Sequence, residues 1–138
     1  MGVCRMLTEQ FNKLRHKNKT PKKNNFTSED IAAIIPAHNE ELAIRKCVQA
    51  LKESLASSQI YVVSDGSTDK TFRRARLEGC HVSNLTPAGG KAKAISYAIK
   101  NYRLYKKYKF IFIVDADTQI DAQFIERALP LFDDPEIG

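Results

Sequence analysis

Two aspartates, Asp115 and Asp117, stand one residue apart directly after the apolar run Phe110–Val114. Carboxylate oxygens are hard ligands, so such a pair suits Mg²⁺ or Mn²⁺ and a phosphate-bearing substrate. The apolar run predicts a buried strand, and open α/β sheets bind ligands at the carboxyl ends of their strands. Because Asp is also common in turns after strands, the pair gains weight only from the rest of the chain.

Polar segments follow two other apolar runs as well. After residues 31–35 comes Pro-Ala-His-Asn-Glu (36–40), and after residues 60–63 comes Ser-Asp-Gly-Ser-Thr-Asp (64–69). In a parallel sheet the carboxyl ends of all strands meet at one edge. The sequence therefore predicts that the three polar segments lie together and form one site.

The side chains of these segments have both functional and structural interpretations. Asp65 precedes Gly66, which permits a tight turn and close backbone approach. The Asp65 carboxylate can accept a ring N–H and so read a nucleobase, or it can simply form an Asx-turn. Asn39 and Glu40 are predicted to open a helix whose free N–H groups favour anions, although Glu40 can equally serve only the helix dipole. His38 has no second His or Cys at ligand spacing and is predicted to be a loop histidine.

Lys91 follows two glycines at the start of a predicted helix, a setting that suits a phosphate contact. The usual phosphate loop is excluded, because Leu85 stands where its first glycine would be and Ala92 where Ser or Thr would be. The sequence contains no Gly-x-Gly-x-x-Gly fingerprint either. A bound nucleotide must therefore be held in another way.

The elements that would position these residues alternate between strand-like and helical patterns. Apolar runs predict strands at 31–35, ended by Pro36, and at 60–63, 80–82 and 110–114. Amphipathic periodicity and capping residues predict helices at 40–55, 69–78, 91–102 and 121–132. Repeated βα units of this size predict a three-layer α/β fold, a mostly parallel sheet with helices on both faces.

Length and cysteine content narrow the class of protein. The 138 residues suffice for one domain with its own core. Cys4, Cys47 and Cys80 are odd in number and far apart, which fits neither a disulfide framework nor a metal site. No signal-peptide pattern opens the sequence and no apolar run is long enough to span a membrane. We therefore expect a reducing, cytoplasmic compartment.

The net charge of +6 lies entirely in residues 1–28, which contain seven basic residues and one acidic residue. Residues 29–138 contain fifteen of each, so the folded part is not basic and no nucleic-acid partner is expected. We expect residues 1–28 to be a flexible basic leader and residues 29–138 to be the domain. Leu7, Phe11 and Leu14 share one helical face, so the leader is either an anchor on an anionic membrane surface or a solvated tail.

Four ordered segments carry a family resemblance. Segments 34–41, 62–69, 90–94 and 114–117 read Ile-Ile-Pro-Ala-His-Asn-Glu-Glu, Val-Val-Ser-Asp-Gly-Ser-Thr-Asp, Gly-Lys-Ala-Lys-Ala and Val-Asp-Ala-Asp. They resemble the nucleotide-sugar-binding half of family 2 glycosyltransferases, which is Rossmann-like and belongs to the GT-A fold. The resemblance covers residues 31–138. The Gly-Lys-Ala pattern is typical of processive, membrane-bound polysaccharide synthases.

The resemblance implies an inverting glycosyltransferase of the hexosyltransferase type. It would transfer sugar from a UDP-sugar to a saccharide or lipid-linked acceptor, and the full-length protein could work at the cytoplasmic face of a membrane. The nucleotide-sugar-binding positions that it implies are Pro36, Ala37, Asn39, Glu40, Asp65, Gly66, Lys91, Asp115 and Ala116.

The resemblance also gives individual roles to four of these side chains. Asp65 would bond uracil, and Lys91 would lie near the base or the diphosphate. Asp117 would bind the Mg²⁺ or Mn²⁺ ion, and Asp115 would contact the ribose or act as a second partner of the metal.

Two departures from the family pattern limit what is implied. Ser64 stands where the family usually has the first of two aspartates. The family's later acidic general base and Gln-x-x-Arg-Trp segment do not occur, and the sequence contains no Trp. No catalytic residue is therefore named, the base is expected beyond Gly138, and the chain alone is expected to bind UDP without efficient transfer.

Two other functions remain open from the sequence. A non-catalytic nucleotide-binding or regulatory module would share the donor site and lack only the acceptor half. A phosphoacceptor receiver-type domain would also place acids at parallel strand ends with a Lys nearby, but it has no use for the Pro-x-x-Asn-Glu segment.

Overall fold

The computed structural model describes residues 25–134 and residue 136, so most of the predicted leader lies outside the described residues. Four strands form one all-parallel sheet in the order β3-β2-β1-β4. The strands are β1 (Ile31–Ala37), β2 (Ile60–Asp65), β3 (His81–Leu85) and β4 (Phe110–Ile113). The predicted parallel α/β sheet is confirmed.

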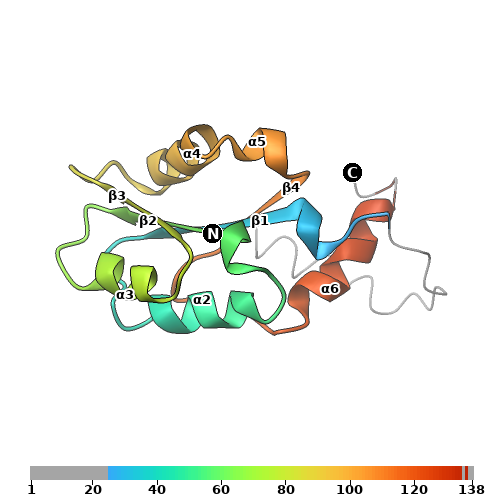
Figure 1. Ribbon diagram of the computed structural model, residues 1–138, viewed down its shortest axis with the longest axis horizontal. Coiled ribbons are helices and arrows are strands. Elements are labelled where there is room, and N and C mark those ends of the chain that lie inside the picture. Colours follow the sequence, from blue (N-terminus) through green and yellow to red (C-terminus); the bar gives the residue numbers. More distant parts are fainter. Residues whose placement is uncertain (1–24, 135, 137–138) are drawn as a thin grey trace.

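Helices cover both faces of this sheet (Figure 1). On one face lie α4 (Lys91–Asn101) and α5 (Leu104–Lys107), and on the other lie α2 (Ile44–Lys52), α3 (Thr71–Leu77) and α6 (Phe124–Ala128). Short 3₁₀ turns precede β1 and β2 as η1 (Ser28–Asp30) and η2 (Ser57–Gln59), and η3 (Leu129–Asp133) follows α6. The predicted three-layer architecture is therefore also confirmed.

Each central strand feeds two separate hydrophobic cores, because successive side chains of a strand point to opposite faces. Ile35 packs in the core beneath α2 and α3, whereas Ile34 packs with Ala94 and Ala98 of α4. All six residues of β2 are buried. Burial on both faces explains why β1 and β2 appear in the sequence as continuous apolar runs without alternation.

Pro36 does not end β1, contrary to the sequence prediction, because the strand runs on to Ala37. Pairing of β1 with β4 stops at Ile34, whose carbonyl accepts the N–H of Val114. Pro36 is two residues further along and faces the same side, beyond the end of β4. Its missing N–H therefore costs no ladder hydrogen bond, while pairing with β2 continues through Pro36 and Ala37.

Several helix boundaries also differ from the prediction. The helix predicted at 40–55 is α2 and begins only at Ile44, and the one predicted at 121–132 splits into α6 and η3. Pro130 lies at the start of η3, where its ring prevents the α-helix from continuing. The short helix α5 was not predicted; it follows Arg103, which adopts a left-handed conformation (φ 52°) and ends α4.

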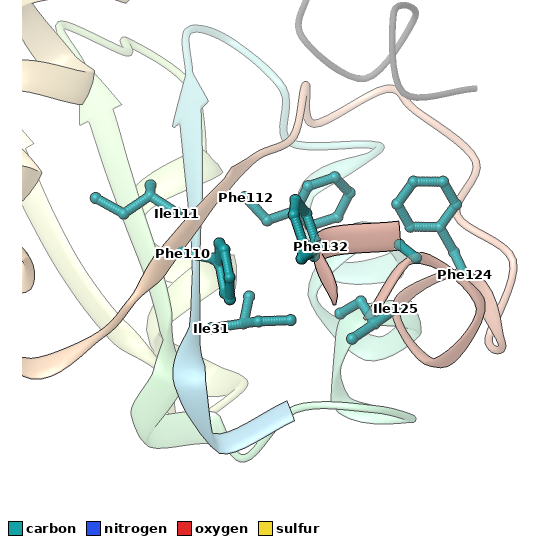
Figure 2. Close-up of a pocket in the computed structure, with 8 residues that line it drawn as sticks. Ile31, Phe110, Ile111, Phe112, Phe124, Ile125 and Phe132 are labelled. Carbon is teal, nitrogen blue, oxygen red and sulfur yellow. The ribbon is translucent and has the colours of Figure 1, made fainter. Parts of the chain in front are cut away.

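An aromatic cluster fills the space between β4 and α6 (Figure 2). Phe110 stacks on Phe132 with ring centroids 4.3 Å apart, and Phe112 stacks on Phe124 at 5.2 Å. The cluster encloses a pocket of about 40 Å³ that is lined almost entirely by apolar side chains. It offers no polar group to a nucleotide, so the candidate site must lie elsewhere.

Candidate functional site

The loops after all four strands meet at the carboxyl edge of the sheet, as the sequence predicts. The Asp65 carboxylate, at the end of β2, accepts the backbone N–H groups of both Gly89 and Gly90, each at 2.7 Å. Asp65 is only 5 % exposed. Two charge-assisted hydrogen bonds therefore join the end of β2 to the loop that leads into α4.

Gly66 turns the chain sharply away from β2 with a φ of +64°. Its N–H donates to the Leu85 carbonyl at 2.7 Å, and a Cβ at this position would lie 2.6 Å from the Cβ of Ala88. Glycine is needed here both for the left-handed conformation and for the close approach of the loop. The predicted tight turn is present.

His38 and Asn39 join the β1 loop to the β2 loop. The Nδ1–H of His38 donates to the Asp65 carbonyl at 2.6 Å. Asn39 adopts a φ of 53°, a conformation that Asn tolerates better than most residues, and its Oδ1 accepts the N–H of Thr68 at 2.8 Å. His38 is thus a loop histidine, and its bond fixes the backbone of the residue predicted to recognise the base.

The N–H groups predicted to favour anions after β1 already have partners. Those of Asn39, Glu40 and Glu41 donate to Ser67 Oγ, Thr71 Oγ1 and Asp69 Oδ2, at 3.1, 2.8 and 3.1 Å respectively. Helix α2 begins only at Ile44. Residues 39–41 therefore serve to hold the β2–α3 loop, and their N–H groups are not open to an anion in this structure.

Asp69 is held in its charged form by the same network. Burial opposes ionisation of Asp69, but hydrogen bonds from the Thr71 hydroxyl, the Thr71 N–H and the Glu41 N–H outweigh it and lower the pKa of the carboxyl. Asp69 thereby joins the start of α3 to the β1 loop.

Lys91 and Asp115 form an ion pair across the site. Lys91 is the first residue of α4, directly after Gly90, and Asp115 follows β4. Their side chains are 47 % and 44 % exposed, so solvent screens the pair and it adds little to stability. The pair nevertheless places a cation at one of the two carboxylates predicted to hold a metal.

Asp117 is exposed and follows Asp115 by two residues. It lines a groove of about 440 Å³ between the start of α2 and the segment after β4. The groove also contains Lys46 and Gln119, which sequence reasoning had not singled out. Lys46 lies on the exposed side of α2 and Gln119 in a loop, and neither position is marked by a sequence pattern.

The other predicted positions contribute through their backbone. Ala37 and Ala116 are 2 % and 4 % exposed, so their methyl groups pack inward and only main-chain atoms can meet a ligand. Ser64 is fully buried, and its hydroxyl has no hydrogen-bond partner among the described residues.

A metal ion would find two carboxylates at this edge, those of Asp115 and Asp117. Within residues 25–134 no group of three or more His, Cys, Asp or Glu side chains could hold an ion by itself. Two exposed carboxylates fit an octahedral Mg²⁺ or Mn²⁺ ion that takes its other ligands from water and phosphate oxygens. The part of the chain that the structure describes also has no helix with the length and apolar character needed to cross a membrane.

Comparison with known proteins gives a family match and several relatives. The family model for glycosyl transferase family 2 matches residues 32–138. An uncharacterised protein of Methanocaldococcus jannaschii is 34 % identical over 113 residues, which cover 82 % of this chain and 46 % of that protein. The 4,4'-diaponeurosporenoate glycosyltransferase of Staphylococcus aureus is 35 % identical over 108 residues, 78 % of this chain and 28 % of that enzyme.

Solved structures share the fold at lower sequence identity. Glucosyl-3-phosphoglycerate synthase from Mycobacterium tuberculosis, in complex with UDP, superposes with a TM-score of 0.58 at 20 % identity and covers 78 % of this chain and 44 % of that one. A mannosyltransferase from Pyrobaculum calidifontis, in complex with GDP-Man and Mn²⁺, gives 0.63 at 20 % identity over 94 % of this chain and 40 % of that one. The chain thus spans less than half the length of these relatives.

Proposed function

Because the chain belongs to glycosyl transferase family 2, we propose that it binds the donor of an inverting glycosyltransferase that uses a UDP-sugar. The observation that carries the proposal is a chain of contacts from Asp65 to Asp115. The Asp65 carboxylate binds the Gly89 and Gly90 backbone, and Lys91, the next residue, pairs with the Asp115 carboxylate. The carboxylate that would recognise the base and one that would help hold the metal thus lie on one edge, joined by a segment suited to a diphosphate.

The nucleotide would lie along this edge. Uracil would bond to Asp65 beside Gly66, with Pro36, Ala37, Asn39 and Glu40 bordering the nucleoside. Lys91 would leave Asp115 to meet the diphosphate, and Asp115 with the backbone of Ala116 would contact the ribose. Since each Asp65 carboxylate oxygen already accepts one N–H group, uracil would bond to a remaining lone pair or replace one of these bonds.

A divalent ion is supported by the donor set and by relatives. Asp117 would bind Mg²⁺ or Mn²⁺, with Asp115 as second partner, and structures of fold relatives contain Mn²⁺ together with a nucleotide sugar. When bound, the ion supplies positive charge that stabilises the departing diphosphate. Lys91 would add a further charge at the same oxygens.

Inversion requires an acceptor hydroxyl to attack the anomeric carbon directly, opposite the leaving diphosphate, while a base takes its proton. Asp115 and Asp117 act on the leaving-group side, so neither is assigned as the base. We therefore expect this chain by itself to bind UDP weakly and to transfer little sugar. Hexosyl transfer, a saccharide or lipid-linked acceptor and a role in polysaccharide synthesis belong to the same proposal, as does anchoring of residues 1–28 on an anionic membrane surface.

Titration calorimetry with UDP and Mn²⁺ tests the donor site. The unsubstituted chain should bind UDP, and Asp65→Ala combined with Asp117→Ala should abolish the heat. Glu53→Ala, an exposed carboxylate at the end of α2, is the matched control and should bind normally. Equal binding by the double variant would refute the site, and a clear preference for GDP over UDP would refute the choice of nucleotide. Binding without transfer by a protein that also carries the acceptor half would favour a non-catalytic module.

A further inference from the structure

The charge of the folded part is zero overall but unevenly distributed. Residues 79–114 contain seven Lys or Arg and no Asp or Glu, whereas residues 115–138 contain seven acidic residues and one basic residue. The cationic stretch includes β3, α4 and α5, so it covers one face of the sheet. Because the basic residues of this stretch are separated from the acidic ones that follow it, the face of the sheet under α4 and α5 carries excess positive charge.

Four of the seven cations of residues 79–114 lie around α5, in a group of five exposed residues that we call the α5 patch: Lys100, Arg103, Tyr105, Lys106 and Lys107. None of its four cations forms an ion pair with a carboxylate among residues 25–134. Tyr105 is 61 % exposed and its ring lies beside the Lys106 ammonium at 6.0 Å. Only Leu104 of this helix is buried, and it anchors α5 to the core.

Arg103 gives a second, independent observation. It adopts a left-handed conformation with φ 52° and ψ 44°, which costs a non-glycine residue about 1 kcal/mol and is more easily adopted by Gly or Asn. Its guanidinium makes no ion pair in the described part of the chain that would explain a cation at this position. The conformation of Arg103 ends α4, but its side chain has no ion-pair partner among the described residues and is free to meet a partner molecule.

The α5 patch lies at the edge of the sheet opposite the candidate donor site. Helix α4 begins at Lys91, beside Asp115, and runs back along the sheet to α5, which leads into the start of β4 (Figure 1). Residues 25–30 lead into the start of β1 at this same edge. Phe26 packs edge-on against Phe110 with centroids 4.9 Å apart, and the Lys109 ammonium lies 5.2 Å from the Phe26 ring.

We propose that the α5 patch binds the surface of an anionic lipid bilayer, with the carboxyl edge of the sheet turned away toward solution. Unpaired cations attract anionic headgroups, and an exposed Tyr among them is the side chain that settles at the membrane–water interface. Sequence-independent binding of single-stranded nucleic acid would instead need several exposed rings in a groove, and Tyr102 and Tyr108 are packed in the core beside Tyr61. This inference does not rest on the proposed donor site.

Sedimentation of the full chain with phosphatidylcholine vesicles, with and without phosphatidylglycerol, tests the proposal. Combining Lys100→Glu, Lys106→Glu and Lys107→Glu should lower binding to the anionic vesicles by at least about tenfold. The matched control reverses the same charge on α3, through Lys70→Glu, Arg73→Glu and Arg76→Glu. Unfolding temperature and UDP binding, measured for both variants, separate a surface effect from loss of the fold or of the donor site.

A single tryptophan gives a direct readout, because the sequence contains none. Emission of Tyr105→Trp should shift to the blue on anionic vesicles only, whereas Leu77→Trp, at a more exposed position on α3, should not shift. Equal loss in the two triple variants, or a shift at both tryptophans, would overturn the proposal. So would loss of oligonucleotide binding in the α5 variant with vesicle binding unchanged.

Discussion

The Lys91 ammonium and the Asp115 carboxylate form an ion pair that closes the candidate donor site from the side of α4. Lys91 follows Gly90, whose N–H is bound by Asp65, so the position of the lysine depends on a residue at the end of another strand. The pair therefore couples the two ends of the site. It also means that nucleotide and metal must exchange partners with residues that already contact one another.

Removal of the lysine should separate metal binding from nucleotide binding. Lys91→Ala frees Asp115 from a competing cation, so Mn²⁺ alone should bind more tightly, while UDP in the presence of Mn²⁺ should bind several-fold more weakly. Manganese titration followed by electron paramagnetic resonance measures the first effect and calorimetry the second. Lys100→Ala, at an exposed position near the other end of α4, should change neither. Weaker Mn²⁺ binding by Lys91→Ala would contradict the competition.

Loss of the Asp65 carboxylate should release the loop before α4. Asp65→Asn replaces one acceptor oxygen with an N–H₂ group that faces an N–H donor, so the bonds to Gly89 and Gly90 cannot both persist. Hydrogen exchange at the Gly89 and Gly90 amides should accelerate, and unfolding free energy should fall by about 1 kcal/mol. Unchanged exchange at these two amides would show that the carboxylate does not hold the loop.

Two glycines with similar backbone conformations should respond differently to alanine. Gly66→Ala places a Cβ within 2.9 Å of Ala88 backbone atoms. Backbone strain and displacement of the loop should therefore lower the free energy of unfolding by about 2–4 kcal/mol. Gly79→Ala also has positive φ but meets nothing within 4 Å, and it should cost only about 1 kcal/mol. Denaturant unfolding compares them. Equal costs would mean that the loop is not packed against Gly66.

The buried hydroxyl of Ser64 should contribute nothing to stability. It is fully buried without a hydrogen-bond partner among the described residues, so no hydrogen bond offsets the free energy of removing it from water. Ser64→Ala should leave the free energy of unfolding unchanged or raise it by up to about 1 kcal/mol. A loss larger than that, measured by denaturant unfolding, would reveal a partner for the hydroxyl.

Acid should weaken the fold in part through Asp69. Its folded pKa is lowered, so its contribution to stability is complete above the unfolded value of about 3.9 and is lost as the pH falls through the folded value. Asp69→Asn removes this contribution at neutral pH and should therefore lose less stability between about pH 6 and pH 3 than the unsubstituted chain. Glu53→Gln is the control. Parallel pH curves for Asp69→Asn and the unsubstituted chain would contradict the assignment.

The sheet could be predicted from the sequence because its central strands are buried on both faces and so appear as long apolar runs. The meeting of Asp65, Lys91 and Asp115 followed from the parallel topology alone. Their bonding could not be predicted, since the sequence suggested an Asx-turn or a base contact for Asp65 and gave no sign of its bonds to Gly89 and Gly90. Such bonds depend on which loop packs beside a side chain, and periodicity carries no information about that.

Helix beginnings and ends were less predictable for a similar reason. Residues 40–43 fit a helical pattern, but the N–H groups of Glu40 and Glu41 bond to Thr71 and Asp69 across the site, and α2 begins after them. The end of a strand likewise depends on its neighbours, as Pro36 shows. It ends pairing only where a neighbouring strand requires its N–H, and the end of β4 at Ile113 removes that requirement.

The bonds from Asp65, His38 and Asn39 to neighbouring loops have a consequence for the thermodynamics of ligand binding. Loops that are already tied to one another have little conformational freedom left to lose. A nucleotide that enters this edge would therefore meet a small entropic penalty for ordering the protein, and its main cost would be the enthalpy of the bonds that it displaces. Calorimetry on such a pre-organised site should give a smaller binding heat than the number of new contacts would lead one to expect.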